Sequence, residues 1–167
     1  MPRLKAVCDS SPLITFAKVR RLHLLLSIFG TPLLIPREVY VEAVEMGLEK
    51  KEHDAVLIKA CIKNNSILVK KARKIIVFPF LGAGENAVIS LALENKAEIV
   101  CVDEAPARNA ARRLGLKPVG SLGVLFLAVQ NKLVSKQDAL DLLDEMIKRD
   151  YRISAKILEK FRKALDK

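Results

Sequence analysis

Five short apolar runs alternate along the chain with longer segments in which apolar residues recur at helical spacing. The run "EIVCVD" has four consecutive apolar residues without alternation, which is typical of a strand covered by helices on both faces. The pattern predicts an α/β fold, a three-layer α/β/α sandwich with a central, mainly parallel sheet. The expected strands lie at residues 4–8, 33–35, 67–69 or 75–77, 98–102 and 117–119.

Helix boundaries are marked by proline, serine and glycine. Ser11-Pro12 and Pro36 are placed to start helices, and Gly115 is placed to stop the helix "EAPARNAARRL". From Ser135 onward, two amphipathic helices are predicted. Their expected apolar faces are Ala139, Leu142, Leu143, Met146 and Ile147, then Ile157, Leu158, Phe161 and Leu165. We expect one domain over residues 1–134 and a helical C-terminal extension, residues 135–167, packed on it.

The charge balance favours nucleic acid as a partner. The chain of 167 residues carries 29 Lys and Arg against 19 Asp and Glu, a net charge of +10 that attracts phosphate backbones. A membrane partner is not expected, because the best apolar stretch is interrupted by Gly30 and Pro32, short of the ~20 residues that a span needs. The N-terminus lacks an apolar segment of signal-peptide length, so a cytoplasmic location is expected. The three cysteines show no paired spacing and predict reduced packing residues.

Two aspartates directly follow predicted strands. Asp9 ends the run in "KAVCDSSPLI" and Asp103 ends "EIVCVD". In a parallel sheet the carboxyl ends of strands share one rim, where ligands bind, so neighbouring strands would bring these carboxylates together. For either residue alone, a capping or turn role is an equally good interpretation.

Two glutamates lie near the predicted apolar faces of helices. In "GAGENAVISLALENK", Glu85 falls between Val88 and Ile89 on the helical wheel, whereas Asn86, Ser90 and Glu94 form an opposite, polar stripe. In "IPREVYVEAVEMG", Glu42 is nearer the apolar face than Glu38 or Glu45. The alternatives are a first-turn Glu85 that complements the helix dipole and a Glu42 that is simply solvated.

Acids gathered at one rim would repel each other, and a divalent cation resolves that repulsion. With only two histidines in the chain, oxygen ligands dominate, and these select Mg²⁺ or Mn²⁺, whose waters can be activated for attack on phosphorus. The predicted polynucleotide contacts are Arg108, Arg112, Lys70 and Lys71. Solvated helix faces are the alternative for individual lysines, and aromatic residues, at 5%, are too few for base stacking to be the main contact.

The four acids in their local sequences resemble the acidic quartet of PIN-domain nucleases. They are Asp9 in "VCDSSPLI", Glu42 in "IPREVYVEA", Glu85 in "GAGENAVISLA" and Asp103 in "IVCVDEAPARNAARRLG". The likeness covers roughly residues 4–134. Its last part, "PVGSLGVLFLAVQNKLV", is similar to a prokaryotic branch related to the VapC-type toxins of toxin-antitoxin pairs. Two departures are a third acid that is Glu where many relatives have Asp, and Ala105-Pro106 where many carry a further acid, which leaves Glu104 as an uncertain substitute.

The resemblance implies a metal-dependent ribonuclease that hydrolyses phosphodiester bonds of single-stranded RNA, with an antitoxin partner in the toxin branch and often a homodimer. It makes Asp9, Glu42, Glu85 and Asp103 the metal ligands and catalytic residues. Ser10 and Ser121 would support them, and Arg108 would contact phosphate. A catalytically inactive PIN-like protein that binds RNA or regulates a partner fits the same sequence.

A dinucleotide-binding protein is a further alternative. "GAGENA" is a G-x-G-x-x-A in which Gly82 and Gly84 open a helix, and Asp103 follows about twenty residues later. Against this interpretation, "FPFL" separates the glycines from the preceding apolar run, which does not suit the tight turn of that motif.

Overall fold

The computed structural model describes residues 5–30 and 32–167, so position 4 of the first predicted strand lies outside the described residues. Five strands are formed: β1 (Ala6–Cys8), β2 (Leu33–Pro36), β3 (Ile67–Lys70), β4 (Ile99–Cys101) and β5 (Lys117–Val119). The helical segments are α1 (Ser10–Lys18), α2 (Leu22–Phe29), α3 (Arg37–Tyr40), the π-helical η1 (Val41–Glu45), α4 (Met46–Glu49), α5 (His53–Lys63), α6 (Ala83–Glu94), α7 (Ala105–Arg113), α8 (Ser121–Gln130), α9 (Lys136–Lys148) and α10 (Ala155–Leu165). No helix in the described part is long and apolar enough to cross a membrane.

All strand pairs of the sheet are parallel, in the order β3-β2-β1-β4-β5. The strands β1, β2 and β4 are buried along their whole length, as the unbroken apolar runs predicted. Of the two candidate positions for the third strand, residues 67–69 are correct, and Ile75 and Ile76 instead belong to a connection between β3 and α6. The predicted α/β fold with a parallel central sheet is confirmed.

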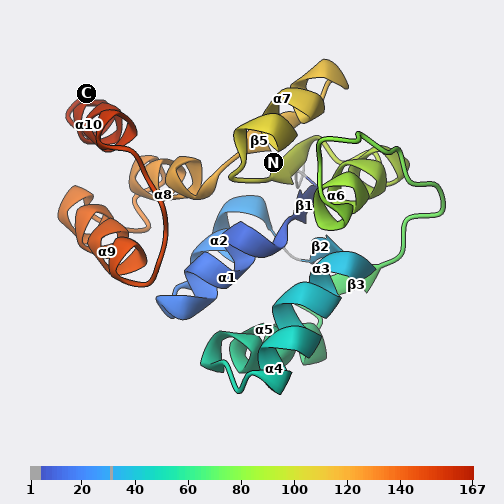
Figure 1. Cartoon of the computed structure of the whole chain (residues 1–167). Coiled ribbons are helices and arrows are strands. Elements are labelled where there is room, and N and C mark those ends of the chain that lie inside the picture. Colours follow the sequence, from blue (N-terminus) through green and yellow to red (C-terminus); the bar gives the residue numbers. More distant parts are fainter. Residues whose placement is uncertain (1–4, 31) are drawn as a thin grey trace.

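Helices cover both faces of the sheet. Figure 1 shows α6 on one side of the strands and α1 and α2 on the other. Helix α6 contacts β1, β2 and β4, while α1 packs against α2, α5 and α8. The core between these layers includes Phe16, Leu25, Ile35, Ile89 and Leu125, all with no exposed side-chain area. This packing fixes the ends of the central strands, where the candidate site lies.

Helix α6 is buried on nearly every side, which differs from the predicted polar stripe. Asn86 is 5% exposed and Ser90 is 1% exposed, because the connection between β3 and α6 runs along them. The Asn86 side chain accepts a hydrogen bond from the Phe78 amide (2.9 Å) and donates to the Phe78 carbonyl (3.3 Å). The Ser90 hydroxyl accepts from the Ile76 amide (2.9 Å) and the Glu94 carboxylate accepts from the Lys74 amide (2.8 Å). The polar residues therefore bind a backbone segment, which buries Asn86 and Ser90 and leaves Glu94 exposed.

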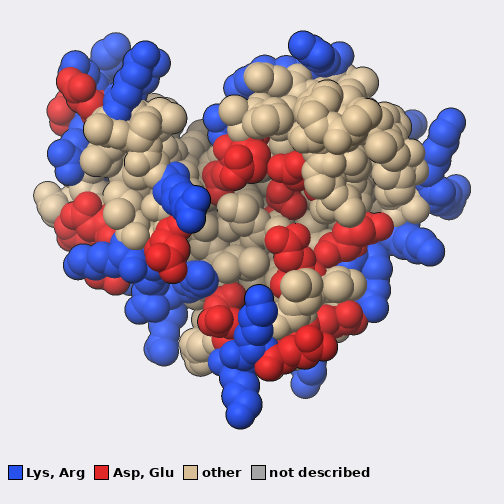
Figure 2. Space-filling model, viewed as in Figure 1, with Lys and Arg blue, Asp and Glu red and all other residues tan. Residues whose placement is uncertain are grey.

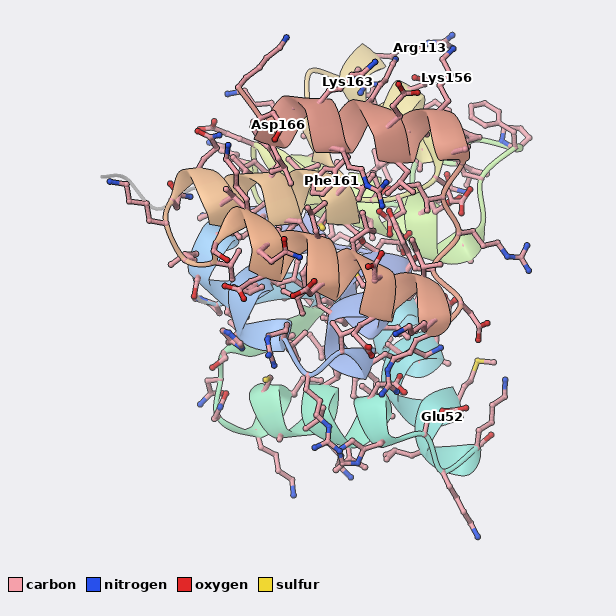
Figure 3. All side chains as sticks on the ribbon, turned by 90° about the vertical axis from the view of Figure 1, so that its left-hand side faces the viewer. Glu52, Arg113, Lys156, Phe161, Lys163 and Asp166 are labelled. Atoms are coloured by element: carbon pink, nitrogen blue, oxygen red, sulfur yellow. The ribbon has the colours of Figure 1, made fainter. Side chains whose placement is uncertain are left out.

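The two C-terminal helices pack on the body of the molecule. Helix α9 contacts α8 and α1, and α10 contacts α8. Ser135 caps α9, and Leu143 and Met146 are buried as predicted, but Ile147 is 37% exposed. Figure 3 shows Phe161 pointing from α10 toward the helices beneath it, with Lys156 and Lys163 on the outer side. Ile157, predicted to pack with Phe161, is 45% exposed.

Replacing Asn86 by Ala should destabilise the protein by about 1–3 kcal/mol, because buried backbone groups of Phe78 and Leu81 would lose their hydrogen-bond partner. Urea unfolding followed by circular dichroism measures this change. Asn109→Ala is the matched control, since the exposed Asn109 side chain accepts a hydrogen bond from Arg112 and, among the described residues, makes no other. Equal effects of the two substitutions would contradict the role given to Asn86.

Candidate active site

Asp9 lies where the strand order changes direction, between β1 and β4. Its backbone amide donates to the Cys101 carbonyl (2.9 Å), which ties the end of β1 to the end of β4. Its side chain is 6% exposed and accepts a hydrogen bond from the Ser10 amide (2.8 Å), so Asp9 is also the N-cap of α1. The helix thus begins at Ser10, two residues before Pro12, the first helical residue that the Ser11-Pro12 pair predicts. Asp9 therefore both lies at the rim of the sheet and caps α1, so the two interpretations hold together.

Asp103 is held by several donors. One carboxylate oxygen accepts from the Ser121 amide (2.7 Å), and the other accepts from the hydroxyls of Ser121 (2.8 Å) and Ser11 (3.3 Å). The Arg108 guanidinium donates to the Asp103 backbone carbonyl. A Cβ at Gly120 would lie 3.1 Å from the carboxylate, so a larger residue here would have to push the Asp103 side chain away by a few tenths of an ångström. The structure thus places Ser121 and Arg108 beside Asp103.

Glu42 lies on the π-helical segment η1, a type of helix distortion that is frequent at functional sites. Pro36 precedes α3 as its N-cap, and Glu42 follows six residues later on an exposed surface. A Cβ added at Gly84 would lie 3.6 Å from the Glu42 carboxylate and 3.5 Å from that of Asp9. The missing side chain at Gly84 therefore leaves a space that both carboxylates border.

Glu85 lies in the first turn of α6, half-buried, next to Gly84. Its carboxylate accepts a hydrogen bond from the Gly82 amide (3.0 Å), which stabilises the helix N-terminus. The capping alternative is therefore realised, and the same position also brings Glu85 near Asp9, as the Asp9 electrostatics show.

Burial raises the pKa of the Asp9 carboxyl group to about 7, against the lowering effect of the hydrogen bond from Ser10. The carboxylates of Glu85, Glu42 and Asp103 raise it further. The three other predicted acids thus lie close enough to act on Asp9 at this rim, although the four come from separate parts of the sequence. Figure 2 shows acidic side chains in the hollow at the centre of this face, with lysine and arginine around it.

The donor set fits a hard divalent cation, since it consists of carboxylate oxygens beside a space that a Cβ at Gly84 would fill. Glu38, four residues before Glu42, adds a carboxylate oxygen that is buried without a hydrogen-bond partner among the described residues. The Glu85 carboxylate accepts a hydrogen bond from a backbone amide, and the Asp103 carboxylate accepts from an amide and from serine hydroxyls. In the described ranges, no three His, Cys, Asp or Glu side chains are close enough to hold a metal ion. Cation binding therefore requires some of these side chains to turn inward.

The predicted nucleic-acid contacts fall into two groups. Arg108 and Arg112 line a groove of about 1010 Å³ that also contains Glu42, Asp103 and Ser10. Lys70 and Lys71 line a separate cavity of about 370 Å³, where Lys70 donates to the Asn95 side chain (3.2 Å) at the C-terminal end of α6. Because Gly84 is at the other end of α6, about 15 Å away along the helix, the structure does not bring these lysines to the acids.

Two residues beside Asp103 had no signal in the sequence. The sequence predicts only a helix-start role for Ser11, whereas its hydroxyl donates a hydrogen bond to the Asp103 carboxylate. Tyr151 comes from the connection between α9 and α10. Burial raises the pKa of the Tyr151 phenol, the Asp103 carboxylate adds to this, and Arg108 opposes it, so its hydroxyl lies among the same groups.

The dinucleotide alternative does not fit the geometry. Strand β3 ends at Lys70, twelve residues before Gly82, so no tight turn links a strand to the glycines. Gly84 faces carboxylates, which would repel a pyrophosphate, and Asp103 is occupied by serine donors.

A family model of the PIN domain matches residues 5–167, nearly the whole chain and including α9 and α10. The chain therefore belongs to the PIN-domain family. PIN domains are generally nucleases and typically use divalent metal ions, which agrees with an acidic rim on a basic protein. A search of curated proteins finds no match.

Asp9→Asn should stabilise the metal-free protein at neutral and higher pH. A carboxyl group with a pKa raised from 3.8 to about 7 on folding binds more protons when folded, so wild-type stability falls as pH rises from about 4 to 7 and is then level. The variant lacks this loss, which amounts to at most about 4 kcal/mol. Thermal unfolding in excess chelator at several pH values measures the difference.

Asp141→Asn, at an exposed carboxylate bonded to Gln137, controls for the loss of one negative charge. A stability gain for Asp9→Asn that does not grow between pH 4 and 7 would show that burial and the neighbouring acids do not perturb Asp9.

Proposed function

We propose that this PIN-domain protein is a metal-dependent ribonuclease that hydrolyses phosphodiester bonds of single-stranded RNA. The observation that carries the proposal is the meeting of Asp9, Glu42, Glu85 and Asp103 at one rim, where the other three raise the pKa of Asp9. The net charge of +10 supports a polyanionic substrate, and Arg108 and Arg112 lie in the groove beside the acids.

The four acids would hold one or two Mg²⁺ or Mn²⁺ ions. When bound, such ions polarise a phosphoryl oxygen and lower the pKa of a water molecule. The chain itself orients the acids: Ser121 and Ser11 hold the Asp103 carboxylate, and the Ser10 amide holds that of Asp9. Since no histidine lines the groove, a proton released during hydrolysis passes to a carboxylate or to solvent.

The resemblance to VapC-type toxins also supports a role as the toxin of a toxin-antitoxin pair, and a homodimer. Two exposed apolar side chains, Val77 (68%) and Phe80 (61%), offer contact area for a second chain. Growth arrest on expression that Asp9→Asn relieves would support the toxin role, and light scattering would give the oligomeric state.

Purified protein should cleave an end-labelled, unstructured RNA in Mn²⁺ and leave 5′-phosphate and 3′-hydroxyl ends. Excess EDTA should abolish cleavage, and Asp9→Asn should slow it by about 100-fold or more, because one ligand charge is lost. Asp141→Asn is the matched control and should cleave at the unaltered rate. Cleavage that persists in chelator would rule out the metal mechanism, and RNA binding without cleavage would favour the inactive PIN-like alternative.

Gly84→Ala distinguishes an effect on cation binding from an effect on the stability of the fold. The new Cβ would make ordinary contacts of 3.5 Å with Asp9 and 3.6 Å with Glu42, and alanine in a helix is about 0.5–1 kcal/mol better than glycine. We therefore expect unchanged or higher thermal stability but about tenfold weaker Mn²⁺ binding, measured by isothermal titration calorimetry. Unchanged Mn²⁺ affinity would show that the cation does not lie between Asp9 and Glu42.

A further inference from the structure

The groove beside the acids is built from several distant parts of the chain. Helix α1 contributes Ile14 and Lys18, and α7 contributes Arg108 and Arg112. The end of β5 and helix α8 also line the groove, and the C-terminal extension lines it through residues 149–154 and Ile157. The volume of about 1010 Å³ is at the upper end of the about 300–1,000 Å³ that holds a small ligand, so the groove has room for a piece of polymer.

Tyr151 connects the extension to the acids. It is half-buried, and its phenol lies close enough to Asp103, Arg108 and Ser121 for all three to influence it. The residues around it, Asp150 and Arg152, also line the groove. The connection between α9 and α10 is therefore anchored at the acidic end of the groove.

The groove carries an excess of positive charge on its walls. Besides the proposed ligands Glu42 and Asp103, it contains Glu104 and Asp150 as acids. Its cationic residues are Lys18, Arg108, Arg112, Arg149 and Arg152. Arg149 is 3.9 Å from Glu145, whereas Arg152 is exposed and forms no ion pair within the described residues. An unpaired arginine on a groove wall is suited to a phosphate group.

Apolar side chains also line the groove. Ile14, Phe126 and Ile153 are half-buried there, and Ile157 is 45% exposed. The position of Ile157 explains why it does not join Phe161 in the core. An apolar surface between arginines and acids can contact the faces of unpaired bases.

We propose that the C-terminal segment 149–157 is the outer wall of the substrate groove and binds a single-stranded polynucleotide, with Arg152 on a phosphate and Ile157 against a base. This proposal rests on the proposed function, since it guides the strand toward the same acids. A duplex fits less well, because its bases are stacked inside and its phosphates would face the apolar side chains.

The first experiment measures binding of a fluorescent, unstructured RNA by anisotropy in excess EDTA, so that no cleavage occurs, over a series of salt concentrations. Arg152→Ala should weaken binding by about three- to tenfold and reduce the slope of log affinity against log salt by about 0.7, as expected for one lost phosphate contact to a single strand. Arg162→Ala, at an exposed arginine of α10 outside the groove, is the matched control and should change neither value.

The second variant tests the apolar contact. Ile157→Ser should weaken binding by about three- to tenfold with no change in salt slope, because no charge is lost. Val56→Ser, at a 51% exposed position of α5, is its control. A paired RNA duplex of the same sequence should bind more weakly and should not respond to Ile157→Ser. Both groove side chains are exposed, so thermal unfolding should be unchanged.

The proposal is overturned if no single-stranded RNA binds, if the controls lose as much affinity as the groove variants, or if the duplex behaves like the single strand. If Asp9→Asn abolishes metal-dependent cleavage and the groove variants leave cleavage unaltered, the proposed nuclease function stands and the substrate-binding role of the extension is rejected. Conversely, if RNA binds and the groove variants weaken binding but no cleavage occurs, the role of segment 149–157 stands and the nuclease function is rejected.

Discussion

A carboxylate buried at the end of a central strand is the constraint on which the rest of this site depends. Asp9 is 6% exposed, its carboxylate accepts a hydrogen bond from the Ser10 amide, and three further acids lie close to it. Ionised, such a group is costly unless positive charge lies close to it. Part of that charge comes from helix N-termini: Asp9 caps α1, Glu85 accepts from an amide at the start of α6, and Asp103 accepts from the first amide of α8.

These partial charges are enough to hold the acids in place but not to neutralise them. The remaining imbalance is what a divalent cation or a proton would satisfy, and it gives the acidic rim its chemical character. The parallel sheet makes this arrangement possible, because parallel pairing brings the carboxyl ends of β1 and β4 to the same edge, with Cys8 opposite Cys101. Fold and site thus share one geometric origin.

The sequence was informative where a residue's position follows from strand or helix period. Asp9 and Asp103 could be placed together because unbroken apolar runs mark neighbouring buried strands. The helical wheel favours a buried position for Glu85, but its contrast with a polar stripe is wrong, since Asn86 is buried by a connection whose path no local pattern encodes. The same limit applies to Tyr151, which reaches Asp103 only through the packing of the C-terminal helices.

The basic residues show most clearly that composition does not predict which side chains lie near the site. Arg112 and Lys70 look alike in the sequence, as members of basic clusters, yet one lines the groove and the other lies near the far end of α6. Amphipathic period located the buried Leu143 of α9 correctly but assigned Ile157 to the core. A wheel identifies an apolar face, and tertiary packing decides whether that face meets a helix or borders a groove.

The order of strands in the sheet also bears on how the protein is made. One edge of β1 is paired only after β4, which begins at Ile99, has been made. The Asp103 carboxylate likewise accepts its hydrogen bonds only after Ser121 has been made. Parallel pairings between distant segments form late, and a chain emerging from the ribosome completes its N-terminal part first. The acids therefore meet only once most of the polypeptide has been synthesised, so the acidic centre stays unassembled for much of the time that the nascent chain spends on the ribosome.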